Sequence, residues 1–207
     1  MPPKMQALAE MPPSASEPLA ICTAAAETKS EDGEAVVDAL LTLERDLRNT
    51  AKTDGGALSR ATLAALNGSW RLIFTTGTVD MQNKLGGRIN YFPLRAVQSF
   101  DTSSMAITNG IYLGEFEVLK FYGEFDWLED RRRLEFDFDT IALFGFKIGL
   151  PKGGAAEIGA STGLGSKSNV QKAKAGKKAF FNWISADPQI ATARGGGGGL
   201  ALWKRER

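Results

Sequence analysis

The 207-residue sequence contains no histidine and only one cysteine, Cys22. Without imidazole, Ser-His-Asp and Cys-His catalysis and the zinc sites that use histidine ligands are excluded. A single thiol forms neither an internal disulfide nor a cysteine-rich zinc site, which excludes a disulfide-stapled secreted scaffold. We therefore expect no metal, no cofactor and no enzyme, although an isomerase based on carboxylates or lysine stays open.

The chain also has almost no net charge and no long apolar run. Its 25 Lys and Arg balance 24 Asp and Glu to give +1, so we expect no nucleic-acid partner. It has no apolar stretch of about 18 residues, so we expect no membrane-spanning helix. Segment 163–168 fails the Walker pattern because Ser166 separates its glycine from Lys167.

The first 30 residues contain no aromatic side chain, no sustained periodicity and five prolines. We expect residues 1–30 to form a disordered leader. They lack the apolar stretch of a secretory signal, and they are too acidic and too poor in arginine for an organelle transit peptide. No transit peptide is recognisable.

Residues 31–66 are expected to form a pair of helices. Apolar residues recur at steps of three and four along one face: Val36, Leu40, Leu43 and Leu47. Ser30 or Asp32 is suited to cap the first helix, and the following glycines end it. The second helix is expected from about residue 59 to 66. The pair is expected to cover a neighbouring core, and a dedicated partner-binding helix is the alternative.

From residue 69 onward the apolar period changes to two, which is typical of strands with one buried face. About nine or ten short strands are expected without intervening helices. The fold is therefore expected to be mostly β, with an antiparallel sheet over 67–207 that closes into a barrel. The five-glycine run that begins at Gly195 is expected to be a turn between the last two strands.

Residues 151–178 interrupt this pattern and are expected to form a long basic loop. The loop is rich in Gly, Ala and Ser, and such long connections are often functional. We expect four of its lysines to contact a membrane surface, with a solvated spacer as the alternative: Lys172, Lys174, Lys177 and Lys178. Its lack of aromatic residues argues against single-stranded nucleic acid.

The apolar faces of the strands suggest a cavity for an apolar ligand, with a filled core as the alternative. The candidate lining residues are Leu72, Phe74, Phe116, Phe136 and Phe138. Glu135, Asp137 and Asp139 alternate with some of them and are expected to face solvent.

Residues 67–76 begin with Asn67-Gly68-Ser69-Trp70 and resemble the opening strand of the plastid lipid-associated proteins, also called fibrillins. The segments 190–196 and 200–205 resemble that family's last hairpin, and residues 136–141 are similar in kind. The resemblance covers about residues 34–207.

The resemblance implies an antiparallel lipocalin-like β-barrel in a plastid, at the thylakoid or plastoglobule. It implies non-catalytic binding of a fatty acid, carotenoid or prenylquinone. The alternative is a protein-interaction module that recruits an isoprenoid or lipid-metabolism enzyme. The Gly68-Ser69-Trp70 match to the lipocalin G-x-W opening implies a structural Trp70 that packs at the closed end, under Lys204 or Arg205.

Overall fold

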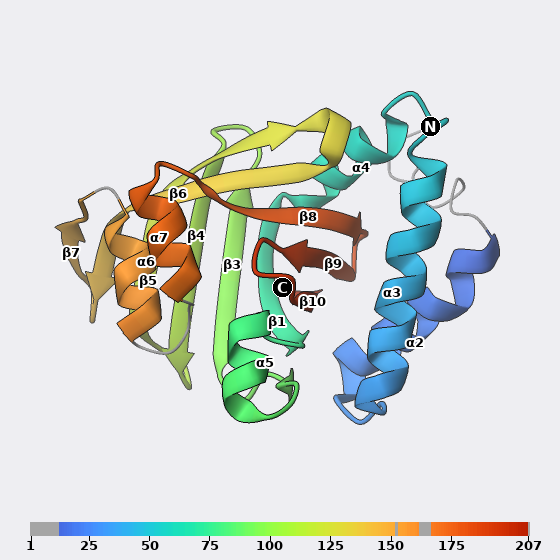
Figure 1. The fold of residues 1–207 in the computed structure, drawn as a ribbon, viewed down its shortest axis with the longest axis horizontal. Helices are drawn as coiled ribbons and strands as arrows, with labels where there is room; N and C mark the ends of the chain where they lie inside the picture. The colour runs from blue at the N-terminus through green and yellow to red at the C-terminus, as the bar shows by residue number, and fades with distance from the viewer. Residues whose placement is uncertain (1–12, 152, 162–166, 207) are drawn as a thin grey trace.

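The computed structural model describes residues 13–151, 153–161 and 167–206. Within them, eight antiparallel strands close into a barrel, because the first strand pairs with the last (Figure 1). The wall consists of β1 (Gly68–Thr75), β3 (Arg95–Asp101), β4 (Ala106–Leu113), β5 (Phe116–Leu128), β6 (Arg133–Leu143), β8 (Ala179–Ala186), β9 (Ile190–Gly195) and β10 (Leu200–Arg205). The mostly β, lipocalin-like barrel expected from the sequence is thereby confirmed.

Two short strands lie outside this ring: β2 (Asn90–Tyr91) pairs with the end of β1, and β7 (Phe146–Gly149) pairs with β6. The glycine run joins β9 to β10 as a tight turn, as expected. Gly199 packs so closely there that a Cβ would overlap the carbonyl oxygen of Gly77. Side chains larger than hydrogen are therefore excluded at this position.

Helices α2 (Ser16–Thr28) and α3 (Gly33–Thr50) pack against the outside of the barrel (Figure 1). The carboxylate of Asp32 caps α3, because its Oδ1 accepts hydrogen bonds from the backbone of Glu34 and Ala35 at 3.0 and 3.1 Å. The helices bury Leu40 and Leu43 against Leu202 in a core of their own, separate from the barrel interior.

The expectation of a disordered leader is wrong for residues 16–28, which form α2, whereas residues 1–12 lie outside the described residues. The buried side chains of α2 are small, such as Cys22, Ala25 and Ala26. Alanine favours a helix, and small side chains let α2 approach the barrel closely. A stripe of small residues gives little periodic signal, which explains why the helix escaped sequence reasoning.

The remaining helices sit at the two ends of the barrel. Helix α4 (Ala57–Leu66) leads into β1 at one end. There it contacts the short 3-10 turn η2 (Glu129–Arg131), which connects β5 to β6. Helix α5 (Val79–Leu85) follows β1 at the other end. The ends are unlike, because the first is filled by side chains and the second contains a cavity.

Residues 151–178 do not form one long loop, which corrects the sequence-based expectation. They contain α6 (Gly154–Ser161) and α7 (Lys167–Lys174), while residues 152 and 162–166 lie outside the described part. Ala155 and Ile158 of α6 pack against a small apolar cluster that includes Phe121 and Ile141. This contact holds the helical pair over the open end of the barrel.

Candidate functional site

The barrel encloses a cavity of about 460 Å³ toward the end covered by α5, α6 and α7. Its wall is largely aliphatic and aromatic, with side chains contributed by strands all around the barrel: Leu72, Phe121, Phe136, Phe138, Phe181 and Trp203. The rings of Phe136 and Phe181 are stacked, with centroids 5.3 Å apart. Cavities of about 300–1,000 Å³ with mainly apolar walls are typical of small-molecule sites.

The opposite end of the barrel is filled by a packed cluster around Trp70. This side chain is fully buried, and its indole N–H donates to the carbonyl oxygen of Leu66 at 2.7 Å. Phe100, Phe125 and Trp183 belong to the same cluster. A ligand entering the cavity therefore meets a solid floor rather than a channel through the barrel.

Arg205, rather than Lys204, covers the ring of Trp70. The guanidinium carbon of Arg205 lies 4.1 Å from the ring centre, a cation–π geometry. Arg205 also donates to the backbone carbonyls of Ala65, Asn67 and Pro188. Burial lowers the pKa of Arg205.

Lys204 points the other way from the same strand, and its ammonium pairs with Glu27 of α2 at 2.6 Å. The alternative that the sequence left open between the two cations is thus decided by the register of β10, in which Trp70 pairs with Arg205.

Three of the five candidate lining residues lie at the cavity: Leu72, Phe136 and Phe138. Phe74 does not, which corrects the expectation from its alternation with Leu72. The pairing of β1 with β10 shifts at Ile73, where the strand contains one extra residue. Such a bulge reverses the alternation beyond it. Phe74 is consequently buried outside the barrel, in the cluster that covers α2 and α3.

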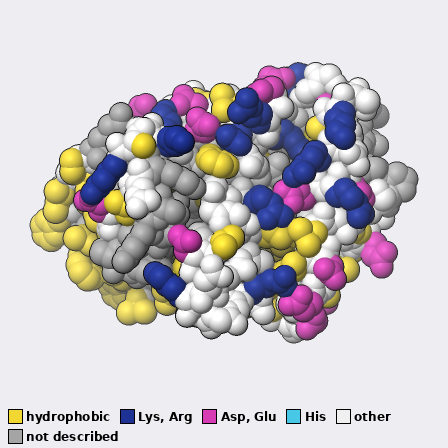
Figure 2. All heavy atoms as spheres, viewed as in Figure 1, with side chains coloured by type: hydrophobic (Ala, Val, Ile, Leu, Met, Phe, Trp, Pro, Cys, Tyr) yellow, Lys and Arg dark blue, Asp and Glu magenta, His cyan; other side chains and the backbone are white. Residues whose placement is uncertain are grey.

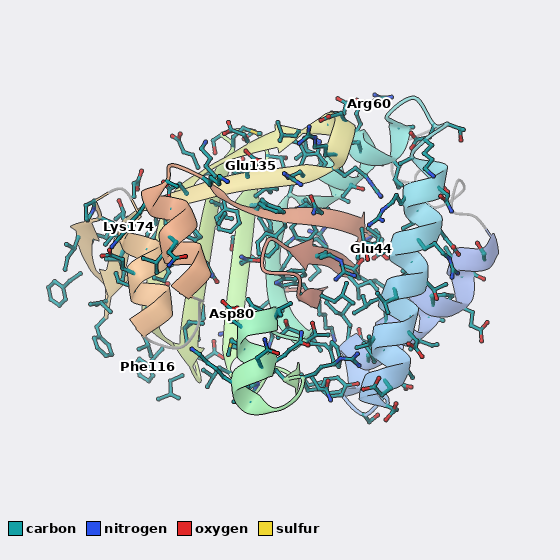
Figure 3. The ribbon with its side chains drawn as sticks, in the orientation of Figure 1. Glu44, Arg60, Asp80, Phe116, Glu135 and Lys174 are labelled. Carbon is teal, nitrogen blue, oxygen red and sulfur yellow. The ribbon has the colours of Figure 1, made fainter. Side chains whose placement is uncertain are left out.

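Phe116 is the other correction, because 82% of its surface is exposed. It is the first residue of β5, beyond the point where the barrel wall encloses the interior. Figure 3 shows its side chain directed away from the ribbon. Alternation predicts which face a residue occupies, but it does not say whether a strand has extended past the barrel.

The lysines of the 151–178 segment differ in their surroundings. Lys177 and Lys178 contribute to the cavity mouth. Lys174 pairs with Glu157 at 3.0 Å, and Lys178 pairs with Asp126. Both lysines therefore have an acidic partner. The side chain of Lys172 lies outside the described residues.

Two amide side chains inside the barrel were missed by sequence reasoning. Gln98 and Asn109 both line the cavity, and they are direct partners across strands β3 and β4. The signal was present in the alternation of β3, because Gln98 lies between the inward-facing Ala96 and Phe100. A polar residue at an inward position within a strand marks such a site.

Three charged residues line the described part of the cavity, Asp137, Lys177 and Lys178, and the cysteine lies away from it. Burial raises the pKa of the Cys22 thiol to about 12, which leaves it protonated and unreactive. Asp137 and Asp139 are exposed and Glu135 is half-buried. The described residues contain no group of three or more acids and cysteines arranged to hold a metal ion. In the same part of the chain, no helix has the length and apolar character needed to cross a membrane.

A larger, polar hollow of about 740 Å³ lies outside the barrel, between α3, α4 and the η2–β8 region. Its charged groups include Glu44, Arg48 and Glu129, all of which take part in ion pairs. Arg132 is buried there and donates to the carbonyl oxygen of Ile184 at 2.8 Å. Cations and anions are balanced at this hollow.

Comparison of the chain with protein-family models, with curated proteins and with solved structures finds no match.

Proposed function

We propose that the protein binds an apolar small molecule inside its barrel, of the fatty acid, carotenoid or prenylquinone type, without catalysis. The apolar cavity of about 460 Å³ above a packed floor is the observation that carries this proposal. Each CH₂ group transferred from water to such a wall contributes about 0.8 kcal/mol. Even a short chain therefore offsets a useful part of the entropic cost of association.

The test is uptake of N-phenyl-1-naphthylamine, a neutral probe whose fluorescence rises in apolar surroundings. Ala96→Phe places a ring in the cavity and should weaken uptake at least tenfold, because Ala96 lines it. Phe136→Ala should change the affinity, whereas Phe116→Ala, the same substitution at an exposed ring, should not. The proposal fails if the wild type takes up no probe or if Ala96→Phe binds as the wild type does.

The ligand type is addressed by extracting the purified protein with organic solvent and analysing the extract by mass spectrometry. The proposal expects a hydrocarbon-rich small molecule in the extract. The plastid setting, at a thylakoid or plastoglobule, is part of this proposal and is supported by the resemblance of the two end motifs. Subcellular fractionation tests it, and recovery of the protein outside plastids contradicts it.

A second function, contact with a lipid surface, is favoured by exposed apolar side chains at two neighbouring hairpin tips. They are Leu113 and Phe116 at the β4–β5 turn, and Phe144, Phe146 and Ile148 at the β6–β7 turn, each more than half exposed. Figure 2 shows hydrophobic side chains gathered at this end of the molecule. We name these five residues the apolar tips.

The apolar tips belong together and lie at the open end of the barrel. The backbone N–H of Phe144 donates to the carbonyl of Val118 at 3.2 Å, which joins the two hairpins. The acids of the first hairpin are neutralised, since Glu115 pairs with Arg95 and Glu117 with Lys120. Apolar tips beside neutralised acids suit the boundary of a lipid layer, and large exposed patches mark interaction sites.

Flotation with liposomes tests this second function. The double variant Phe116→Ser/Phe146→Ser should lose most of its vesicle binding while it keeps uptake of the naphthylamine probe. Leu41→Ser is a matched control, because Leu41 is also exposed but lies on α3. Equal flotation of the wild type and the double variant contradicts lipid contact. In that case, co-purification of a partner that the double variant loses supports the protein-interaction module instead.

A further inference from the structure

The buried amide oxygen of Gln98 has no hydrogen-bond partner among the described residues. Only 7% of this side chain is exposed, and its Oε1 atom is buried and accepts no hydrogen bond from the described residues. Buried polar side chains in folded proteins nearly always have a partner, so an exception asks for an explanation. Because Gln98 lines the cavity, the explanation lies in what the cavity binds.

Asn109 adds a second amide beside Gln98, on the neighbouring strand. It pairs with Gln98 in the β3–β4 register, so the two side chains leave the same face of the wall with Cβ atoms about 5 Å apart. On either side in the same row stand Trp70, paired with Gln98, and Phe121, paired with Asn109. The two amides are therefore set into an otherwise aromatic row, directly beside the floor of the barrel.

The amides are not needed to hold the barrel together. The main chains of Gln98 and Asn109 take part in the sheet ladder whatever their side chains are. Next to them on β3 and β4, Ala96, Phe100, Ile107 and Ile111 present apolar groups to the interior. An apolar residue at position 98 fits this wall and removes an unsatisfied polar group, a change that is often neutral or favourable.

We propose that Gln98 and Asn109 recognise an uncharged hydroxyl or carbonyl group carried at the inner end of the otherwise apolar ligand. This inference rests on the proposed function and names its ligand class more closely. A half-turn of an amide about its last torsion exchanges its oxygen and nitrogen, so the pair can accept from a hydroxyl or donate to a carbonyl. Either contact satisfies the buried amide and fixes the depth of the ligand.

An ionised acid group does not suit this position. A carboxylate brought into an apolar wall needs a cation, and neutral amides compensate its charge poorly. Among the described lining residues the cations are Lys177 and Lys178, which belong to the segment after α7 at the mouth. A fatty acid would accordingly bind in the reverse direction, with its charge at the mouth, and would leave Gln98 without a partner.

The experiment compares three fluorescent probes of one shape: 1-pyrenemethanol, 1-ethylpyrene and 1-pyrenecarboxylate. The wild type should bind the alcohol about three- to tenfold more tightly than the hydrocarbon, the range that one net hydrogen bond provides. Gln98→Met, a substitution of similar volume, should abolish this preference, and Asn109→Leu should reduce it. Gln171→Met, at an exposed position on α7, is the matched control and should keep it.

The outcomes separate this inference from the proposed function. If the wild type binds the alcohol and the hydrocarbon equally, or if Gln98→Met keeps the preference, the recognition role of Gln98 is refuted while apolar binding stands. If the carboxylate binds most tightly, the polar end lies at the lysines and the inference is also refuted. If none of the three probes binds, the proposed function itself fails. The wild-type comparison decides the matter even if a variant does not fold.

Discussion

Trp70 and Arg205 face each other across the two strands that close the barrel, with the guanidinium carbon 4.1 Å from the centre of the indole ring. The same guanidinium binds the carbonyls of Ala65, in the last turn of α4, and of Asn67, which connects α4 to β1. One side chain thus fastens the last strand, the first strand and the helix that precedes it.

Arg205→Met should destabilise the protein by about 1–3 kcal/mol, because three carbonyls lose a charged donor and the indole loses its cation. Lys204→Met is the matched control on the neighbouring residue. Its partly exposed pair with Glu27 should contribute at most about 1 kcal/mol. Urea unfolding measures both, and an equal effect of the two variants contradicts the structural role of Arg205.

Trp70→Ala should lower the free energy of unfolding by about 3–5 kcal/mol, since it removes a fully buried ring from the floor of the barrel. Thermal unfolding followed by circular dichroism gives the measurement. A variant of unchanged stability and altered affinity for the naphthylamine probe would show that Trp70 belongs to the ligand site instead.

Gly123→Ala should destabilise the protein by about 1–3 kcal/mol or more, because a Cβ at this position overlaps the carbonyl oxygen of Asp137 on the paired strand. The pairing of β5 with β6 is irregular at this point, which brings the two backbones together. Gly87→Ala, with open space around its Cβ position, serves as the control. Similar midpoints in urea for both variants would contradict the close approach.

Glu44 joins α3 to the barrel and should make stability depend on pH. Arg194 donates to both of its carboxylate oxygens, at 2.8 and 2.6 Å, and this hydrogen bonding lowers the pKa of Glu44 in the folded state. Since the folded pKa lies below the unfolded value of about 4.3, the stabilisation is complete above that value. It is lost as the pH falls through the folded pKa.

Glu44→Gln should therefore cost about 1–3 kcal/mol at pH 7 and progressively less in acid below pH 4. Urea unfolding at a series of pH values provides the comparison with the wild type. A difference that stays constant down to the lowest pH at which both proteins fold contradicts the linkage.

Lys177 should contribute to binding of anionic vesicles by about 1 kcal/mol, roughly a fivefold change in affinity. It is exposed at the cavity mouth. The double variant Lys174→Gln/Glu157→Gln removes an ion pair without changing net charge, and its binding should equal that of the wild type. Flotation of Lys177→Gln at low and high salt tests this, and equal binding of all three proteins excludes an electrostatic role for Lys177.

The barrel was predictable from the sequence because its signal is repeated along the chain. Alternating apolar residues mark nearly every strand, and the Asp32 cap and the apolar face from Val36 to Leu47 mark α3. The position of the floor also followed from Trp70, because the resemblance to the lipocalin opening placed it there. These features depend on local pattern, which a single sequence records.

The errors at the site have nonlocal causes. The extra residue at Ile73 places Phe74 on the outer face of the barrel. The local amino-acid sequence does not distinguish this bulge from a regular strand. Phe116 continues the alternation of β5, yet it lies beyond the wall that would have buried it. Gln98 was passed over because polar residues inside a barrel look like interruptions of a strand pattern until the opposing wall is known.

The pairing of β1 with β10 also sets the order in which the barrel is completed during synthesis. At elongation rates of about 5–20 residues per second, β1 emerges on the order of ten seconds before its partner. Throughout that interval one edge of β1 has no native neighbour, and the apolar faces of α2 and α3 lack their partners on β8, β9 and β10. Unpaired edges invite pairing with other chains. Nascent chains halted before Leu200 are therefore the species expected to aggregate, through β1 itself.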